Sequence, residues 1–320
     1  MIQLLCELNK MRKTDFGLLV VFGAILFSCG GTEEKKATEE KADKFPAELT
    51  TFTPYEKNPV FAGTGTETWD SKIRERGFIM KEGDEWSLWY TGYSKTSGDE
   101  TKYLGLATSD DGLSWERYSE RPVYDSLWVE DMFVWKENGT YYMAAEGRDD
   151  VAHLLTSDNR VTWTSQGALD VRQKSGQPLT PGPYGTPTLW KENNTWYLFY
   201  ERNDHGIWLA TSEDMKVWTN VQDEPVIAMG PESYDQYAVA MNQVIKYKGR
   251  YYGYYHASAF EDWREWTMNI AVSDDLVHWE KYEGNPIMKN NLSSGMVVET
   301  NDGFRFYTMH PEVNAFLPVK

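Results

Sequence analysis

One pattern occurs five times in this chain: KEGDEWSLWY (81–90), KENGTYYMAA (136–145), KENNTWYLFY (191–200), KYKGRYYGYY (246–255) and TNDGFRFYTM (300–309). Each copy is a turn followed by a stretch rich in aromatic side chains. The corresponding aromatic residues stand 55 residues apart, at Trp86, Tyr141, Trp196, Tyr251 and Phe306. A constant period of this length indicates a repeat architecture in which one structural unit is used five times.

The remainder of each period is also typical of β-structure. A Ser-Asp or Ser-Glu pair stands six residues before a tryptophan in four periods, with the serines at 109, 157, 212 and 273. Turn signals and apolar stretches leave room for four antiparallel strands per period, which is the content of a propeller blade. We therefore predict an all-β, five-bladed β-propeller with four-stranded antiparallel blades over residues 46–320. The fifth period lacks the serine motif, so we expect residues 47–57 to supply its outer strand and close the ring.

The first 45 residues have a different character. Basic residues, the apolar run 16–27 and then Ser28-Cys29-Gly30 form the pattern of a secretory signal. Leu26-Phe27-Ser28-Cys29 resembles a bacterial lipobox, so we predict a signal peptide over 1–29 with a lipidated Cys29. Residues 30–45 are rich in charge and are predicted to be a flexible tether. The protein is then expected to be lipid-anchored to the bacterial cell envelope, on the periplasmic or cell-surface face of the outer membrane.

Composition excludes several functions. The net charge of −17 and the pI near 4.8 disfavour a nucleic-acid partner, because phosphates need cations. Both cysteines, Cys6 and Cys29, precede the predicted propeller, which excludes a disulfide framework and a cysteine metal site within it. No glycine-rich dinucleotide motif follows a predicted strand, so no redox or nucleotide cofactor is predicted. Clustered carboxylates also suit calcium, and a bound calcium ion therefore stays open.

The candidate site follows from blade geometry. The start of each first strand and the end of each second strand meet at one mouth of the central channel. These positions differ between repeats and are rich in ionisable groups: Asp70, Arg74, Glu75, Arg76, Glu130, Asp131, Tyr184 and Asp235 in the first set, and Glu146, Glu201, His256 and His310 in the second. Crowded carboxylates repel one another, which raises some pKa values and gives an acid and a base together. Glycoside hydrolysis needs such a pair.

Structural roles remain open for several of these residues. Glu130 and Asp131 are adjacent, so only one of them faces the channel if the strand is regular. The segment Arg74-Glu75-Arg76 is either an internal ion-pair cluster or a set of substrate clamps. His256 and His310 are either substrate ligands or hydrogen-bonded residues of the rim.

These residues also resemble a known family. Five blades with acidic inner-strand starts resemble the propeller glycosidases of glycoside hydrolase families 43, 32, 68, 117 and 130. The motifs are similar to an uncharacterised bacterial group labelled family-43-like: Trp69 to Gly77, Trp128 to Met132, Gly182 to Pro187, Gly230 to Asp235 and Tyr307 to Pro311. The resemblance implies a catalytic aspartate in blade one, a modulating aspartate in blade three and an acidic glutamate in blade four. This chain departs from that pattern. Blade three has Gly185-Thr186-Pro187 and no aspartate, and blade four has Ala240-Met241-Asn242 and no glutamate.

The resulting hypothesis is a glycoside hydrolase acting on an extracellular or periplasmic oligosaccharide. Asp70 would be the base or nucleophile, Asp131 would tune pKa values or hold hydroxyls, and Glu201 or else His256 would be the acid. The remaining candidates would bind substrate: Arg74, Glu75, Arg76, Glu130, Glu146, Tyr184, Asp235, His256 and His310. The missing blade-three and blade-four carboxylates leave a non-catalytic glycan-binding protein as one alternative. A phosphorylase resembling family 130 is another, with Arg74, Arg76, Arg148 and Arg202 holding phosphate.

Overall fold

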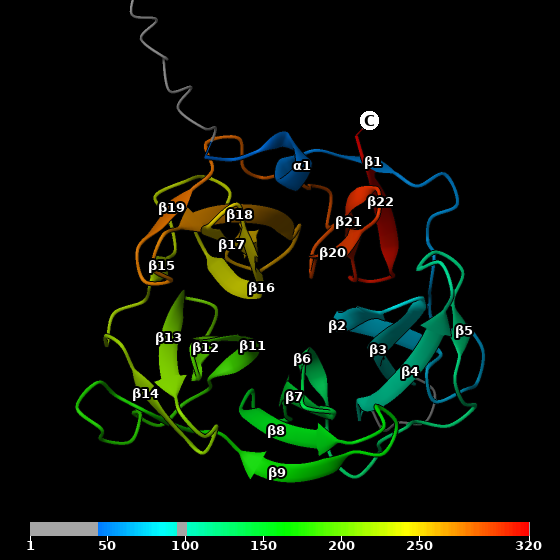
Figure 1. Ribbon diagram of the computed structural model, residues 1–320, viewed down its shortest axis with the longest axis horizontal. Helices are drawn as coiled ribbons and strands as arrows, with labels where there is room; N and C mark the ends of the chain where they lie inside the picture. Colours follow the sequence, from blue (N-terminus) through cyan, green and yellow to red (C-terminus); the bar gives the residue numbers. More distant parts are fainter. Residues whose placement is uncertain (1–43, 95–100, 320) are drawn as a thin grey trace, which may run out of the picture. The chain divides into compact units, whose positions relative to one another are not determined.

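The protein is a five-bladed propeller, as predicted. The computed structural model describes residues 44–94 and 101–319, and the predicted signal peptide with Cys29 lies outside the described residues, as do residues 30–43 of the predicted tether. Five small sheets surround a common axis (Figure 1). Within the described ranges, no helix is long and apolar enough to cross a bilayer.

The blades follow the chain in order, each beginning with its innermost strand. Blade one contains β2 (Lys72–Glu82), β3 (Glu85–Tyr93), β4 (Tyr103–Ser109) and β5 (Glu116–Arg117). Blade two contains β6 (Glu130–Glu137), β7 (Thr140–Glu146), β8 (Ala152–Ser157) and β9 (Thr164–Ala168). Blade three contains β11 (Gly185–Glu192), β12 (Thr195–Glu201), β13 (Gly206–Ser212) and β14 (Val217–Asn220), extended by the short strands β10 (Asp170–Arg172) and β15 (Ile227–Ala228). Blade four contains β16 (Ala238–Tyr247), β17 (Arg250–Ser258), β18 (Thr267–Ser273) and β19 (Trp279–Lys281).

The same strand pairing recurs between the second and third strands of four blades. The first aromatic residue of each second strand pairs with the serine that ends the third strand, as Trp86 does with Ser109. The same register joins Tyr141 to Ser157, Trp196 to Ser212 and Tyr251 to Ser273. The serine hydroxyl then caps the following turn, and Ser109 Oγ accepts hydrogen bonds from the backbone N–H groups of Asp111 and Gly112. One pairing register is therefore repeated in four blades, although the loops between the paired residues differ in length.

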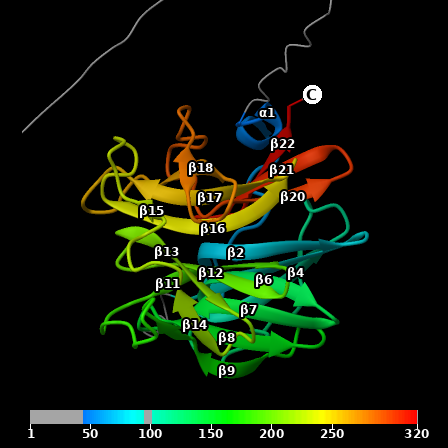
Figure 2. The same ribbon diagram turned by 60° about the vertical axis from the view of Figure 1, so that its left-hand side comes forward.

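The N-terminal segment completes the fifth blade, which contains β20 (Met296–Thr300), β21 (Gly303–Thr308) and β22 (Asn314–Pro318). Strand β1 (Phe52–Pro54) pairs antiparallel with β22, so the expected closure by residues 47–57 is confirmed. The short helix α1 (Ala47–Thr50) precedes β1 and lies beside this blade (Figures 1 and 2). Leu49 is fully buried, and its carbonyl accepts a hydrogen bond from Tyr254 Oη at 2.9 Å.

We expect Leu49→Ala to weaken this closure. Truncating a fully buried leucine removes apolar contacts and leaves a cavity, which costs about 2–5 kcal/mol. Urea unfolding should show that loss, while Thr53→Ala, at an exposed position of β1, should change the free energy of unfolding by less than about 1 kcal/mol. Equal effects of the two substitutions would contradict a stabilising role for α1.

Candidate active site

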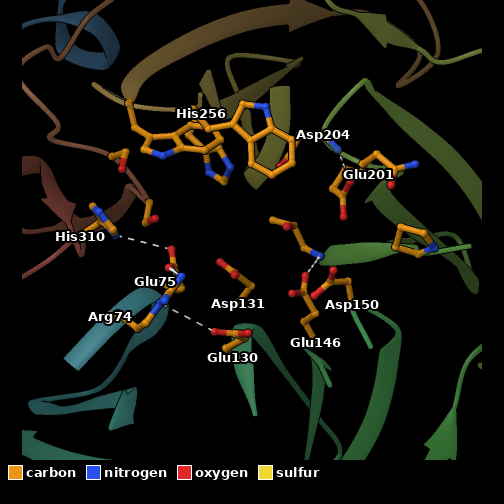
Figure 3. A pocket seen from close by; sticks show the side chains of 17 residues that line it. Arg74, Glu75, Glu130, Asp131, Glu146, Asp150, Glu201, Asp204, His256 and His310 are labelled. Atoms are coloured by element: carbon orange, nitrogen blue, oxygen red, sulfur yellow. Dashed lines mark hydrogen bonds and ion pairs between the residues drawn. The ribbon is translucent and has the colours of Figure 1, made fainter. Parts of the chain in front are cut away.

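A pocket of about 390 Å³ lies where the first strands begin and the second strands end (Figure 3). It is lined by these predicted residues: Arg74, Glu75, Glu130, Asp131, Glu146, Glu201, His256 and His310. The glutamates Glu146 and Glu201 end β7 and β12, and His256 lies two residues before the end of β17. Because these positions are related by the repeat, blade geometry places them around one axis. The predicted gathering of these side chains is confirmed.

The first strands are irregular at this pocket. Bulges interrupt the register of β2 after Arg74, of β6 after Glu130 and of β11 after Gly185. Inside these bulges, three non-glycine residues have positive φ angles: Glu75 at 56°, Asp131 at 46° and Thr186 at 46°. All three line the pocket. A bulge re-aims side chains, so both Glu130 and Asp131 reach the pocket, and the alternation expected for a regular strand does not apply.

Glu75 is held ionised by its partners. It forms an ion pair with Arg74, and its Oε2 lies 3.5 Å from His310 Nδ1 (Figure 3). Burial alone would raise the pKa of Glu75, but the hydrogen bond with His310 and the charge of Arg74 lower it to about 2. Arg74, Glu75 and His310 thus form an ion-pair cluster that lines the pocket, and Arg76 is not part of it.

Other carboxyl groups of the pocket have pKa values that are raised rather than lowered. Burial, with the negative charge of Glu75, raises the pKa of Asp131 to about 7. Burial and neighbouring carboxylates raise the pKa of Glu146 well above its usual value, although its Oε2 accepts a hydrogen bond from Thr186 N–H at 2.8 Å. The pKa of Glu201 is raised mainly by burial, against hydrogen bonds from backbone N–H groups that include Gly185 at 3.0 Å. One pocket therefore holds carboxyl groups in different protonation states.

Glu130 is supported from below the surface by groups that the sequence did not single out. Lys102 Nζ lies 3.2 Å from Glu130 Oε2, and both side chains are almost fully buried. Trp128 Nε1 donates a hydrogen bond to Glu130 Oε1 at 2.8 Å. Burial raises the pKa of Glu130, while the charge of Lys102 opposes that rise.

His256 is neutral in this environment. It is buried, and its ring packs edge-on against Trp266 with centroids 4.9 Å apart. Burial and the positive charge of Arg76 lower the pKa of His256 to about 3. Near neutral pH the ring therefore lacks the second, acidic proton of an imidazolium, which disfavours His256 as the general acid. It can still exchange hydrogen bonds with a ligand in the pocket.

Arg76 lies beneath the pocket rather than in its lining, and it does not contact the space where a substrate would sit. Its Nη1 donates to Thr188 Oγ1 at 2.7 Å and to the carbonyls of Met241 and Asn242. Its Nη2 donates to the carbonyls of Asp131 at 2.5 Å and Pro187 at 2.6 Å. The predicted substrate clamp is therefore a structural residue, because its guanidinium is used to tie the first strands of four blades together.

Asp70 is also outside the pocket, which corrects its predicted place at the channel mouth. Its carboxylate is buried and lies 2.6 Å from Arg117 Nε, and it accepts a hydrogen bond from Tyr90 Oη at 3.0 Å. The indole of Trp69 stacks on Tyr90 with centroids 5.8 Å apart. The other carboxylate oxygen of Asp70 accepts a hydrogen bond from Thr68 Oγ1 at 2.9 Å. Asp70 thus joins the loop before β2 to the outer strand β5, and these partners lie in the same blade or in the loop that leads into it.

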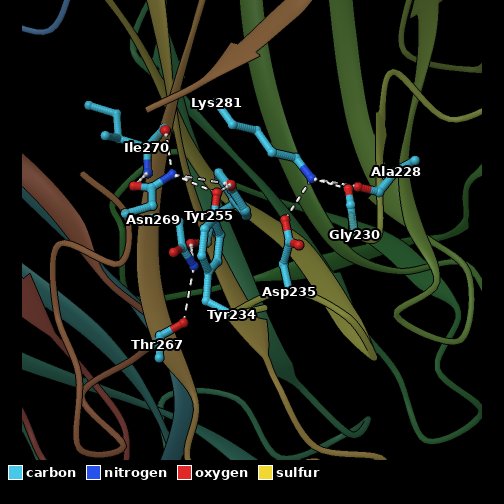
Figure 4. A network of polar contacts seen from close by, with 10 residues as sticks. Ala228, Gly230, Tyr234, Asp235, Tyr255, Thr267, Asn269, Ile270 and Lys281 are labelled. Atoms are coloured by element: carbon cyan, nitrogen blue, oxygen red, sulfur yellow. Dashed lines mark hydrogen bonds and ion pairs between the residues drawn. The ribbon is translucent and has the colours of Figure 1, made fainter. Parts of the chain in front are cut away.

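Asp235 and Tyr184 are directed away from the pocket as well. Asp235 is fully buried and pairs with Lys281 at 2.6 Å, and Lys281 also donates to the carbonyls of Ala228 and Gly230 (Figure 4). The hydroxyl of Tyr184 donates to the Leu169 carbonyl at 2.9 Å. Both were predicted to bind substrate because they precede inner strands, but their polar atoms are used within the fold.

The lining also contains residues that the sequence reasoning missed, among them Asp150, Asp204, Trp263 and Trp266. They lie in the loops that follow β7, β12 and β17, beyond the positions that the 55-residue period relates. Burial and neighbouring carboxylates raise the pKa of Asp204 well above its usual value. The only sequence signal was the length of the tryptophan-containing loop 259–266. Across 44–94 and 101–319, no group of three or more His, Cys, Asp or Glu side chains is arranged to hold a metal ion, so calcium gains no support there.

We expect Arg76→Lys to destabilise the protein and distort the pocket. A lysine keeps the charge but cannot satisfy five acceptors, and each lost hydrogen bond to a buried charged group costs about 1.5–3 kcal/mol. Urea unfolding should show this loss. Arg172→Lys, which alters an exposed arginine, is the matched control. An unchanged unfolding midpoint for Arg76→Lys would contradict the structural role.

We expect Asp70→Asn to reduce stability and to spare the pocket. The substitution removes a charge partner of Arg117 and weakens a buried contact, at a cost of about 1–3 kcal/mol. Thermal unfolding measures that loss, and any glycoside turnover measured below the unfolding transition should stay within about two-fold of wild type. A large loss of turnover with unchanged stability would return Asp70 to the catalytic machinery.

Comparisons with known proteins agree with the fold. Residues 42–180 match the model of the glycosyl hydrolases family 32 N-terminal domain. An uncharacterized protein of Mycobacterium tuberculosis (strain H37Rv) is 25% identical over 207 residues, covering 58% of this chain and 67% of that protein. The 1,2-beta-oligomannan phosphorylase of Thermoanaerobacter sp. (strain X514) is 27% identical over 168 residues, covering 48% of this chain and 53% of that protein.

Solved structures show the same architecture. A glycosyl hydrolase from Bacteroides ovatus superposes with a TM-score of 0.69 at 17% identity, covering 84% of this chain and 95% of that one. A structure from the GH130 family of mannoside phosphorylases, which contains hydrolases that target β-1,2 mannosidic linkages in Candida mannan, superposes with a TM-score of 0.68 at 16% identity, covering 83% and 92%. In its fold, and in sequence over residues 42–180, the chain resembles the five-bladed propeller glycosidases.

Proposed function

We propose that the protein is a glycoside hydrolase that cleaves an O-glycosyl bond of an oligosaccharide, with Asp131 as the general acid. The observation that carries the proposal is the pair formed by Asp131 and Glu75 in one pocket. Asp131 has a pKa raised to about 7, whereas Glu75 has a pKa lowered to about 2. Two carboxyl groups whose pKa values are driven apart are the arrangement that acid-assisted glycoside cleavage requires.

Each group then has a role. Protonated Asp131 gives its proton to the glycosidic oxygen as the bond from that oxygen to the anomeric carbon breaks. Ionised Glu75 stabilises the positive charge that develops on the sugar ring. Water adds to the anomeric carbon and loses a proton to Glu201, whose pKa is raised and whose carboxylate is fixed by backbone N–H groups. The indoles of Trp263 and Trp266 offer apolar faces to sugar rings at the pocket wall.

Phosphorolysis is the second candidate, because of the similarity to an oligomannan phosphorylase. It needs a cationic site for phosphate, for which the sequence offered Arg74, Arg76, Arg148 and Arg202. In the part of the chain that the structure describes, only Arg74 of these four arginines lines the pocket. Its guanidinium is already paired with the carboxylates of Glu75 and Glu130. The surrounding acidic groups disfavour an anion. The structure therefore favours water over phosphate as the acceptor.

The substrate screen should begin with the sugars named by the similar proteins. β-1,2-Linked mannose oligosaccharides are the first probes, followed by sucrose-type fructosides and plant oligosaccharides. Each is incubated with and without inorganic phosphate. Phosphate-dependent formation of a sugar phosphate would replace hydrolysis with phosphorolysis. Binding of a glycan without any product after long incubation would instead support a non-catalytic glycan-binding protein.

We expect Asp131→Asn to lower kcat/KM about 10²- to 10⁴-fold, the usual contribution of a general acid. The amide can still accept the hydrogen bond that Asp131 Oδ1 receives from Arg76 N–H at 3.2 Å, so the fold is retained. Aryl glycosides with a nitrophenolate leaving group need little protonation and should lose much less activity. Asp170→Asn, on the exposed strand β10, is the control and should leave turnover unchanged.

The pH profile gives a further readout of the same acid. Only the protonated form of Asp131 donates, so wild-type kcat/KM should fall as pH rises through about 7. Because the pKa of Glu75 is about 2, this carboxylate stays ionised at every pH above that value. It therefore adds no further limb to the pH profile at about pH 7. An alkaline limb that persists unchanged in Asp131→Asn would remove Asp131 from the acid role.

A further inference from the structure

A second cavity of about 490 Å³ adjoins the pocket, between blades one and two. We propose that this outer pocket, defined by Asp125, Leu127, Trp128, Arg148, Asp149 and His153, binds an additional sugar unit of the substrate. The protein would then act on oligosaccharides of at least three units in preference to disaccharides. The inference rests on the proposed glycoside-cleaving function and adds the substrate class.

The two pockets share a wall. Within the loop that follows β7, Glu146 and Asp150 line the first pocket, while residues 147–149 between them line the outer pocket. Trp128 lines the outer pocket and donates its indole N–H to Glu130, which lines the first. The outer pocket therefore lies next to the first pocket, on the side of Glu130 and Glu146.

The lining of the outer pocket suits a sugar. Arg148 lies 5.0 Å from the Trp128 ring centroid, which orients its guanidinium. Within the described ranges, this guanidinium makes one protein hydrogen bond, to Thr101 Oγ1 at 3.3 Å, so further N–H donors remain for hydroxyl groups. Asp125 and Asp149 supply acceptors, and Leu127, 42% exposed, supplies an apolar surface for the ring. Acceptors beside a donor fit a polyol better than an anion.

The positions of the pocket residues also indicate the direction in which a bound oligosaccharide would extend. Figure 3 places Glu130 and His256 on opposite sides of the pocket, with Asp131 between them. Trp128 of the outer pocket bonds to Glu130, whereas Trp266 packs on His256. An oligosaccharide that extends from the outer pocket toward Trp266 would thus carry a glycosidic bond past Asp131.

The test separates binding from cleavage. In the Asp131→Asn background, an array from disaccharides to hexasaccharides of mannans, fructans and plant glycans measures affinity without turnover. Arg148→Ala and Leu127→Ser are introduced into that background, with Arg172→Ala as the matched surface control. We expect affinity for trisaccharides and longer glycans to exceed that for disaccharides, and both pocket variants to lower it about ten-fold or more while disaccharide affinity is unchanged. The control should match the parent.

Each result distinguishes the two proposals. Length-dependent binding that both pocket variants abolish supports the outer pocket, even if the wild-type protein cleaves nothing and the hydrolase proposal fails. Cleavage by wild type with equal affinity for disaccharides and trisaccharides overturns the outer pocket and leaves the hydrolase proposal standing. Equal losses for short and long glycans in Arg148→Ala, or no glycan binding at all, also overturn it.

Discussion

The central constraint of this structure is a fully buried guanidinium. Arg76 lies on the first strand of blade one, and its guanidinium donates hydrogen bonds to groups on the first strands of blades two, three and four. Desolvation lowers the pKa of Arg76 to about 10, and the charges of Asp131 and Glu146 oppose that shift. The guanidinium therefore stays charged near neutral pH, where it closes the base of the pocket and holds the strand starts at fixed separations. A point charge such as an ammonium could not serve so many acceptors in one plane.

The same residue links stability to chemistry. The backbone N–H and the guanidinium of Arg76 both bond to Asp131, at its Oδ1 and its carbonyl oxygen. These contacts hold Asp131 in its left-handed bulge conformation, which a non-glycine residue adopts only when its surroundings over-determine it. The bulge then buries the carboxyl group near Glu75, and this burial raises the pKa of Asp131. The raised pKa of Asp131 thus depends on backbone geometry, which the sequence motif alone does not specify.

The repeated parts of the fold could be predicted because pairing registers repeat in sequence. The pairing of Trp86 with Ser109 has counterparts in three further blades. Steps of 55 residues from Thr91 reach Glu146, Glu201 and His256, and His310 stands one residue before the next step. The prediction failed where a partner came from another element. Asp70 and Asp235 were ionisable residues before inner strands, but Arg117 on β5 and Lys281 on β19 bind them inside the fold. Nothing in the local sequence distinguishes such an aspartate from one that faces the axis.

The remaining gaps have a different physical cause. In a regular strand, successive side chains point to opposite faces of the sheet, so the face of each residue can be predicted. A bulge disrupts this alternation for the residues inside it. Asp131 and Glu130 therefore reach the same pocket. Asp204 and Trp263 lie in loops whose lengths differ from blade to blade, so the period that located their neighbours could not locate them. Repetition builds the ring and fixes where its strands start, and the departures from repetition supply the chemistry. A five-fold symmetric mouth would present equal carboxyl groups with similar pKa values, whereas cleavage of a glycosidic bond needs two that differ.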